Sequence, residues 1–229
     1  MLSILITAGP TREHLDDVRF LSNASSGRMG CALAEAAMSA GHQATLVLGP
    51  VDIAPPCGAH VRSVTSALEM QAAAEDVFET TDVVIAAAAV TDWRPVSRQS
   101  GKPPRSAGRT TIELEPNPDI VKGLAARRGS RVVFGFALES VSAGMDAAVE
   151  RGRRKIVDKG LDAVAVNLHD AMGSDEVELV LCHADGRQDA LPRSDKRRAA
   201  ELLIAAAVDA WEVRNGSARA RSAQENRAP

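Results

Sequence analysis

The chain has 229 residues, 45% hydrophobic and 25% charged, with a formal net charge of −3, which is ordinary for a soluble globular protein. The slightly acidic balance excludes a global positive field for nucleic acid or for an anionic membrane surface, and no apolar run reaches membrane-spanning length. Three widely spaced cysteines, without metal-ligand spacing, favour a cytoplasmic protein with reduced thiols.

Short apolar runs separated by turn residues give the element order in the first half of the chain. Ser66 is a good N-cap for the second helix, and Gly41 ends the first. The connection from Gly9 to Ser26 is long for a compact domain, and such connections are often functional. The predicted strands are 2–7, 44–48, 60–64 and 82–88, and the predicted helices are 29–40 and 66–77.

The second half begins with a polar stretch over 91–109, which lacks any hydrophobic period and predicts a mobile flap. Asp185-Gly186 between two apolar runs is a hairpin signal. Residues 1–214 are predicted to form one domain, and 215–229 a disordered tail without apolar period. The predicted strands are 110–114, 131–138, 162–166, 177–182 and 189–191, and the predicted helices are 117–127, 143–159 and 194–213.

Alternation of apolar strands with helices indicates the fold class. Strands that are apolar throughout are typical of a parallel sheet covered on both faces. We therefore expect an α/β fold, a Rossmann-like doubly wound mostly parallel sheet with a late antiparallel β-hairpin. In such sheets ligands bind beyond the carboxyl ends of the strands, where the long first connection lies.

Small polar residues cluster between the first predicted strand and the following helix. Hydroxyl groups, free backbone N–H groups and the positive end of a helix dipole would converge there, as an anion such as phosphate requires. An ordinary serine N-cap with a loop before it is the alternative. The candidate residues are Gly9, Ser22, Asn23, Ser25, Ser26 and Gly27.

Two polar residues follow the buried strand at 82–88. Asp92 could accept hydrogen bonds from a ribose, and Arg94 could hold that carboxylate or a phosphate, although an aspartate also simply caps a strand end. The polar stretch beyond them carries basic residues, for which a solvated loop is the common meaning. These are Lys102, Arg105 and Arg109.

A third group of cations lies on one helix face. Lys155 and Lys159 are four residues apart, and Arg151 comes one turn earlier. Like charges stacked in this way cost stability unless an anion lies between them. A solvated helix face is the competing interpretation.

Several motifs in order resemble the phosphopantothenoylcysteine synthetase family. The opening reads T-A-G-P-T-R-E from Thr7, followed by S-N-x-S-S-G-R-M-G to Gly30. The match continues through A-A-V-T-D-W-R at 88–94, N-P-D-I at 117–120 and G-F-A-L-E at 135–139, then the two lysines, and covers the chain to about Val213. In many bacteria this domain follows a flavin-dependent decarboxylase half, which is missing here, so the resemblance implies a separate synthetase.

The resemblance implies a ligase that joins 4′-phosphopantothenate to L-cysteine in coenzyme A biosynthesis. CTP, or alternatively ATP, would form an acyl-nucleotidylate with release of pyrophosphate, and cysteine would then displace CMP. Mg²⁺ would be held by the nucleotide phosphates, without assignable protein ligands. The resemblance also implies a homodimer, with the late hairpin as its contact.

The resemblance also assigns roles to individual residues. Asn23 would hold the carbonyl of the intermediate, and Lys102 would reach the phosphates from the flap. The flap departs from the usual Lys-x-Lys-Lys, because this chain reads Lys102-Pro-Pro-Arg105. Nucleotide contacts would come from Asp92, Asn117, Pro118, Asp119, Ile120, Phe136, Lys155 and Lys159.

Two other readings stay open for this fold class. An NAD(P)-dependent oxidoreductase is disfavoured because no G-x-G-x-x-G follows the first strand and no acidic residue closes the second. The chain also has no tyrosine for Tyr-Lys catalysis. A non-catalytic nucleotide- or flavin-binding module would not need basic residues from separate segments.

Overall fold

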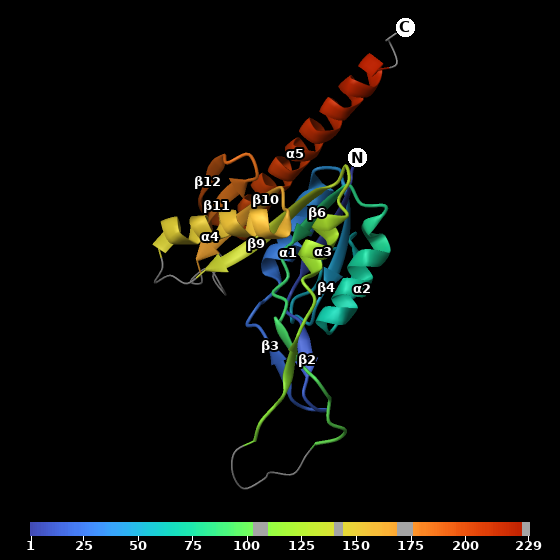
Figure 1. Ribbon diagram of the computed structural model, residues 1–229, viewed down its shortest axis with the longest axis vertical. Helices are drawn as coiled ribbons and strands as arrows, with labels where there is room; N and C mark the ends of the chain where they lie inside the picture. The colour runs from blue at the N-terminus through green and yellow to red at the C-terminus, as the bar shows by residue number, and fades with distance from the viewer. Residues whose placement is uncertain (103–109, 140–143, 169–175, 226–229) are drawn as a thin grey trace.

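The computed structural model describes residues 1–102, 110–139, 144–168 and 176–225, and its centre is an eight-stranded sheet. The strand order is β12-β11-β10-β9-β6-β1-β4-β5 (Figure 1). Within this sheet β1, β4, β5, β6, β9 and β10 are mutually parallel, and β11 and β12 pair antiparallel at one edge. The strands are β1 (Ser3–Ala8), β4 (Gln43–Leu48), β5 (His60–Ser63), β6 (Val83–Ala86), β9 (Val132–Glu139), β10 (Ala163–Leu168), β11 (Glu176–His183) and β12 (Gln188–Asp195).

Helices cover both faces of this sheet, which confirms the predicted doubly wound α/β fold (Figure 1). Side chains alternate along each strand, so Ile4 and Ile6 of β1 belong to the core cluster on the side of α1 and α5, while Leu5 belongs to the cluster on the side of α2, α3 and α4. The helices are α1 (Arg28–Ser39), α2 (Ala67–Phe78), α3 (Ile120–Ala126), α4 (Gly144–Lys159) and α5 (Lys196–Glu225).

The strand order reverses at β1, which lies between β4 and β6. From β1 the chain builds outward to β4 and β5 on one side, then returns to build β6, β9 and β10 on the other. The carboxyl ends of β1 and β6 therefore flank a crevice, where doubly wound sheets bind their ligands.

Two short antiparallel ribbons correct the prediction for the long connections. Residues 9–26 contain one ribbon, and the predicted flap contains the first strand of the other, so neither segment is structureless. The strand predicted at 110–114 is wrong in its bounds, because pairing begins only at Leu114. Three-residue strands are too short to produce a detectable period. The ribbons are β2 (Arg12–His14) with β3 (Phe20–Ser22), and β7 (Trp93–Pro95) with β8 (Leu114–Pro116).

Backbone and side-chain hydrogen bonds join the loops of the two ribbons. Asp17 accepts from the backbone N–H of Gly101 at 2.8 Å, and the N–H of Gln99 donates to the carbonyl of Leu15 at 2.9 Å. The first ribbon lies beyond the body formed by sheet and helices (Figure 1).

The last helix also differs from its predicted extent. Its end at Val213 is wrong, because α5 continues to Glu225 through a stretch rich in alanine and arginine, which are strong helix formers. The boundary at residue 214 and the disorder of the tail stay predictions. None of the helices in the described ranges is both long and apolar enough to cross a bilayer.

Candidate active site

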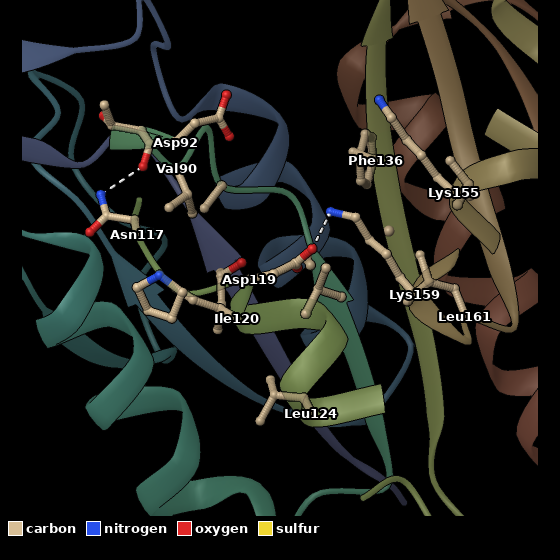
Figure 2. A pocket seen from close by; sticks show the side chains of 18 residues that line it. Val90, Asp92, Asn117, Asp119, Ile120, Leu124, Phe136, Lys155, Lys159 and Leu161 are labelled. Carbon is tan, nitrogen blue, oxygen red and sulfur yellow. Dashed lines mark hydrogen bonds and ion pairs between the residues drawn. The ribbon is translucent and has the colours of Figure 1, made fainter. Parts of the chain in front are cut away.

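A cavity of about 380 Å³ opens at the carboxyl ends of the central strands, between α3 and α4 (Figure 2). Thr7 of β1, Ala86 of β6 and Gly135 of β9 form part of its wall. The cavity brings together the eight residues to which the family resemblance assigns nucleotide contacts. They are Asp92, Asn117, Pro118, Asp119, Ile120, Phe136, Lys155 and Lys159.

Asn117 ties together the loops that form one wall of this cavity. Its side-chain amide donates to the carbonyl of Thr91 at 2.7 Å, and its backbone N–H donates to the carbonyl of Asp92 at 2.8 Å. Its side-chain oxygen accepts from Arg94 at 3.2 Å. The amide of Asn117 is thus used to shape the wall, while Asp92 is exposed at the same cavity.

Arg94 lies outside the lining of the cavity and holds the second ribbon. Its guanidinium donates to the carbonyl of Pro116 at 2.8 Å and pairs with Glu115 at 3.0 Å. The predicted phosphate role for Arg94 therefore stays a prediction, since in this arrangement its donors face protein acceptors.

Asp119 performs two tasks with its two carboxylate oxygens. Oδ1 accepts from the backbone N–H of Lys122 at 3.1 Å, so Asp119 is the N-cap of α3. Oδ2 pairs with Lys159 of α4 at 3.0 Å, across the cavity from α3 (Figure 2). One residue therefore fixes the start of α3 and restrains a cavity lysine.

Glu139, at the end of β9, pairs with two further cations of α4. Its carboxylate, 12% exposed, accepts from Arg151 at 2.5 Å and from Lys155 at 2.9 Å. Burial acts to raise the pKa of Glu139, but the hydrogen bonds from Lys155 and Arg151 outweigh it and lower that pKa. The charges of Arg151 and Lys155 are therefore compensated by a carboxylate of the chain itself.

Gly152 brings α4 close enough to the sheet for these contacts. A Cβ atom at this position would lie 2.4 Å from Cγ2 of Val166 in β10, which real side chains do not tolerate. The close approach carries the helix face of Lys155 and Lys159 to the cavity, on either side of Phe136 (Figure 2).

A second cavity, of about 200 Å³, adjoins the first and shares Ala88 and Phe136 with it. Its lining includes the predicted small-residue loop, namely Ser25, Ser26 and Gly27, at the start of α1. Gly27 has φ +72° and is buried, so this N-cap position requires a glycine. Asn167 and Lys196, which the sequence motifs do not single out, also line this cavity.

Asn23 and Ser22 serve backbone groups beside the second cavity rather than lining it. The Asn23 amide donates to the carbonyls of Ala89 and Val90, at 3.2 and 3.0 Å, and the Ser22 hydroxyl donates to the carbonyl of Thr11 at 2.8 Å. Gly9, also outside both linings, accepts at its carbonyl from the N–H of Ala89 at 2.9 Å.

The flap cations are not brought to either cavity within the part of the chain that is described. Lys102 is exposed and belongs to neither lining. Arg105 and Arg109 lie outside the described residues. Over the described ranges, no group of three or more histidine, cysteine, aspartate or glutamate residues is placed to hold a metal ion.

Comparison with known proteins identifies the family. Residues 1–210 match the model described as DNA/pantothenate metabolism flavoprotein C-terminal domain. The chain belongs to this family. It is 40% identical over 208 residues to the coenzyme A biosynthesis bifunctional protein CoaBC of Vibrio cholerae, covering 88% of this chain and 51% of that protein.

Solved structures agree with this assignment. The C-terminal domain of a CoaBC bifunctional protein is 33% identical with a TM-score of 0.75, covering 89% of this chain and 92% of that one. The Cab2 H337A variant in complex with phosphopantothenate-cysteine shares the fold, with a TM-score of 0.79 at 16% identity, and covers 95% and 89%. The chain spans about half the length of the curated relatives that it matches.

Proposed function

We propose that this chain joins 4′-phosphopantothenate to L-cysteine in coenzyme A biosynthesis, in the cytoplasm, using CTP in preference to ATP. The observation that carries the proposal is the pair of adjoining cavities that share Ala88 and Phe136. One presents the two lysines of α4, as a triphosphate requires, and the other presents the small-residue loop at the start of α1.

The proposed reaction has two steps. A carboxylate oxygen of phosphopantothenate attacks the α-phosphorus of the nucleotide, and the bond to the β-phosphate oxygen breaks to release pyrophosphate. The amine of cysteine then attacks the acyl carbon, the acyl–phosphate bond breaks to release CMP, and the amine loses a proton. Such transfers depend on positioning and on neutralising phosphate charge, which Lys155 and Lys159 would supply.

The acyl intermediate would form where the two cavities meet. Phe136 would lie against the nucleotide and Asp92 would accept from its ribose. Asn23 would hold the acyl carbonyl only by giving up its hydrogen bonds to Ala89 and Val90. Lys102 would reach the phosphates by movement of the flap or from another copy of the chain.

Mg²⁺ is proposed to accompany the nucleotide. Mg²⁺ in nucleotide sites is commonly held by phosphate oxygens with one or two carboxylates. Asp92 and Asp119 are the carboxylates among the lining residues of the larger cavity, so these residues fit a phosphate-bound Mg²⁺. The ion would neutralise charge on the leaving pyrophosphate.

The homodimer is also part of the proposal, and exposed apolar side chains on the ribbons suggest where copies meet. Phe20 is 40% exposed, Trp93 52%, Val96 49% and Leu114 39%. These side chains lie on or next to two ribbons whose loops are hydrogen-bonded to each other, and large exposed apolar side chains on neighbouring segments can mark an interaction surface. We therefore favour the ribbons over the late hairpin as the dimer contact.

The test is product formation by the purified chain. Phosphopantothenate, cysteine, Mg²⁺ and either CTP or ATP should yield pyrophosphate and phosphopantothenoylcysteine, detected by mass spectrometry, with the higher rate for CTP. Lys159→Gln should reduce the rate, whereas Arg154→Gln, on an exposed face of the same helix, should not. Absence of product with both nucleotides would refute the proposal.

A further inference from the structure

Each lysine that lines the larger cavity is held by a carboxylate of the chain. Lys155 pairs with Glu139 at 2.9 Å, and Lys159 pairs with Asp119 at 3.0 Å. A triphosphate that enters the cavity must therefore compete with these carboxylates for both ammonium groups. Under the proposed function, binding is an exchange of ion-pair partners rather than a simple addition.

Such an exchange is unfavourable when it leaves a poorly solvated carboxylate without a donor. Glu139 is only 12% exposed, so water would compensate incompletely for the loss of Lys155. Removing one partner of a buried ion pair is costly because it leaves the other charge without compensation. The geometry must supply a second donor if Lys155 is to move to a phosphate easily.

Both carboxylates have such a second donor. Arg151 donates to Glu139 at 2.5 Å through Oε2, whereas Lys155 uses Oε1. The backbone N–H of Lys122 donates to Oδ1 of Asp119, whereas Lys159 uses Oδ2. Each lysine can therefore leave while its carboxylate keeps a hydrogen bond.

We propose that Arg151 is a positioning residue that keeps Glu139 paired, so that Lys155 can be transferred to the phosphates of the ligand. Arg151 is not among the lining residues of the cavity, so it acts through Glu139 rather than on the nucleotide. The proposal rests on the proposed function in one respect, namely that the ligand of Lys155 is a nucleoside triphosphate.

A double-mutant cycle on CTP binding tests this role, with Mg²⁺·CTP titrated by calorimetry in the absence of the other substrates. Arg151→Gln should weaken CTP binding by about tenfold, because Lys155 then stays on a carboxylate that has no other partner. Arg151→Lys should restore most of the affinity. In the Glu139→Gln background, Arg151→Gln should have no further effect, because no carboxylate remains to be kept paired.

The cycle separates this role from simple long-range charge. If Arg151 acted only by its positive charge, Arg151→Gln would weaken binding equally with Glu139 and with Gln at position 139, which would overturn the inference. Arg154→Gln, which removes the same charge from an exposed face of α4, is the matched control and should leave binding unchanged.

Other outcomes are equally decisive. Equal weakening by Arg151→Gln and Arg154→Gln would overturn the inference while the proposed function stands. Failure of the wild-type chain to bind CTP or ATP would end both together. Thermal unfolding of each variant checks that it is folded. If Arg151→Gln is not folded, Arg151→Met, which keeps the aliphatic part of the side chain, takes its place.

Discussion

Replacement of Asp119 separates helix capping from ion pairing, because its two oxygens have different partners. Asp119→Ala removes the N-cap of α3, worth about 1 kcal/mol. It also removes the ion pair with Lys159. The side chains of Lys159 and Asp119 are 32% and 39% exposed, so this pair contributes about 0.5 kcal/mol. Asp119→Asn keeps a good capping side chain and loses only the charge. We expect a loss of about 1.5 kcal/mol for alanine and about 0.5 kcal/mol for asparagine.

Urea unfolding measures this difference. With a slope of about 2 kcal/mol per molar urea, the midpoint should fall by about 0.75 M for Asp119→Ala and about 0.25 M for Asp119→Asn. Asp158 is an exposed carboxylate on α4, one turn from the cavity residue Lys155. As a control, Asp158→Ala should change the midpoint little. Equal midpoints for the alanine and asparagine variants would refute the capping role.

Three further predictions concern the loops. Asn23→Asp removes the amide that donates to Ala89 and Val90 and that would hold the acyl carbonyl in the second step. Quenched-flow mass spectrometry should therefore detect accumulating acyl-nucleotidylate, and normal product release would contradict this. Lys102→Gln should slow pyrophosphate release by roughly 10- to 100-fold without changing the melting temperature, since the side chain is exposed; a wild-type rate would exclude a phosphate role. Hydrogen bonds from the N–H groups of Arg19 and Val18 lower the pKa of Asp16 from 3.8 to about 2. Asp16→Asn should therefore destabilise the protein above pH 4, and its deficit in urea unfolding should shrink as the pH falls from about 4 to about 2. A deficit independent of pH would mean that the charge of Asp16 is not the cause.

The regular elements could be predicted because their signals are local. Apolar runs gave each sheet strand to within a few residues, and Ser66 does cap α2, accepting from the N–H of Glu69 at 3.2 Å. Asp185-Gly186 forms the turn between β11 and β12, with Gly186 at φ +90°. The fold class followed from this alternation, without any information about contacts.

The ribbons and the ion-pair partners could not be predicted in the same way. Pairing of Arg12 with Ser22 depends on contacts across a polar loop, and three-residue strands have no period. Glu139 follows an apolar strand, yet only the return of α4 over the sheet brings Arg151 and Lys155 to its carboxylate. Its acidic side chain at a strand end was the available signal.

The site residues themselves were found mainly through the family resemblance. Eight predicted nucleotide residues converge on one cavity, including Asp119, Phe136 and Lys159. Their roles toward a ligand stay predictions. Arg94 illustrates the difficulty, because an arginine beside an aspartate suggested phosphate, whereas its donors hold Glu115 and the carbonyl of Pro116.

The hydrogen bonds among three distant loops have a consequence for how the protein opens. The hydroxyl of Thr11 accepts from the N–H of Thr91 at 2.9 Å, the carbonyl of Thr91 accepts from the Asn117 amide at 2.7 Å, and the N–H of Asn117 donates to Asp92. All three bonds involve the loop of Thr91 and Asp92, so movement of that loop breaks them together. Hydrogen exchange at the Thr91 and Asn117 amides should therefore occur in one cooperative opening, in which the nucleotide wall is lost as a single unit while the buried sheet stays protected.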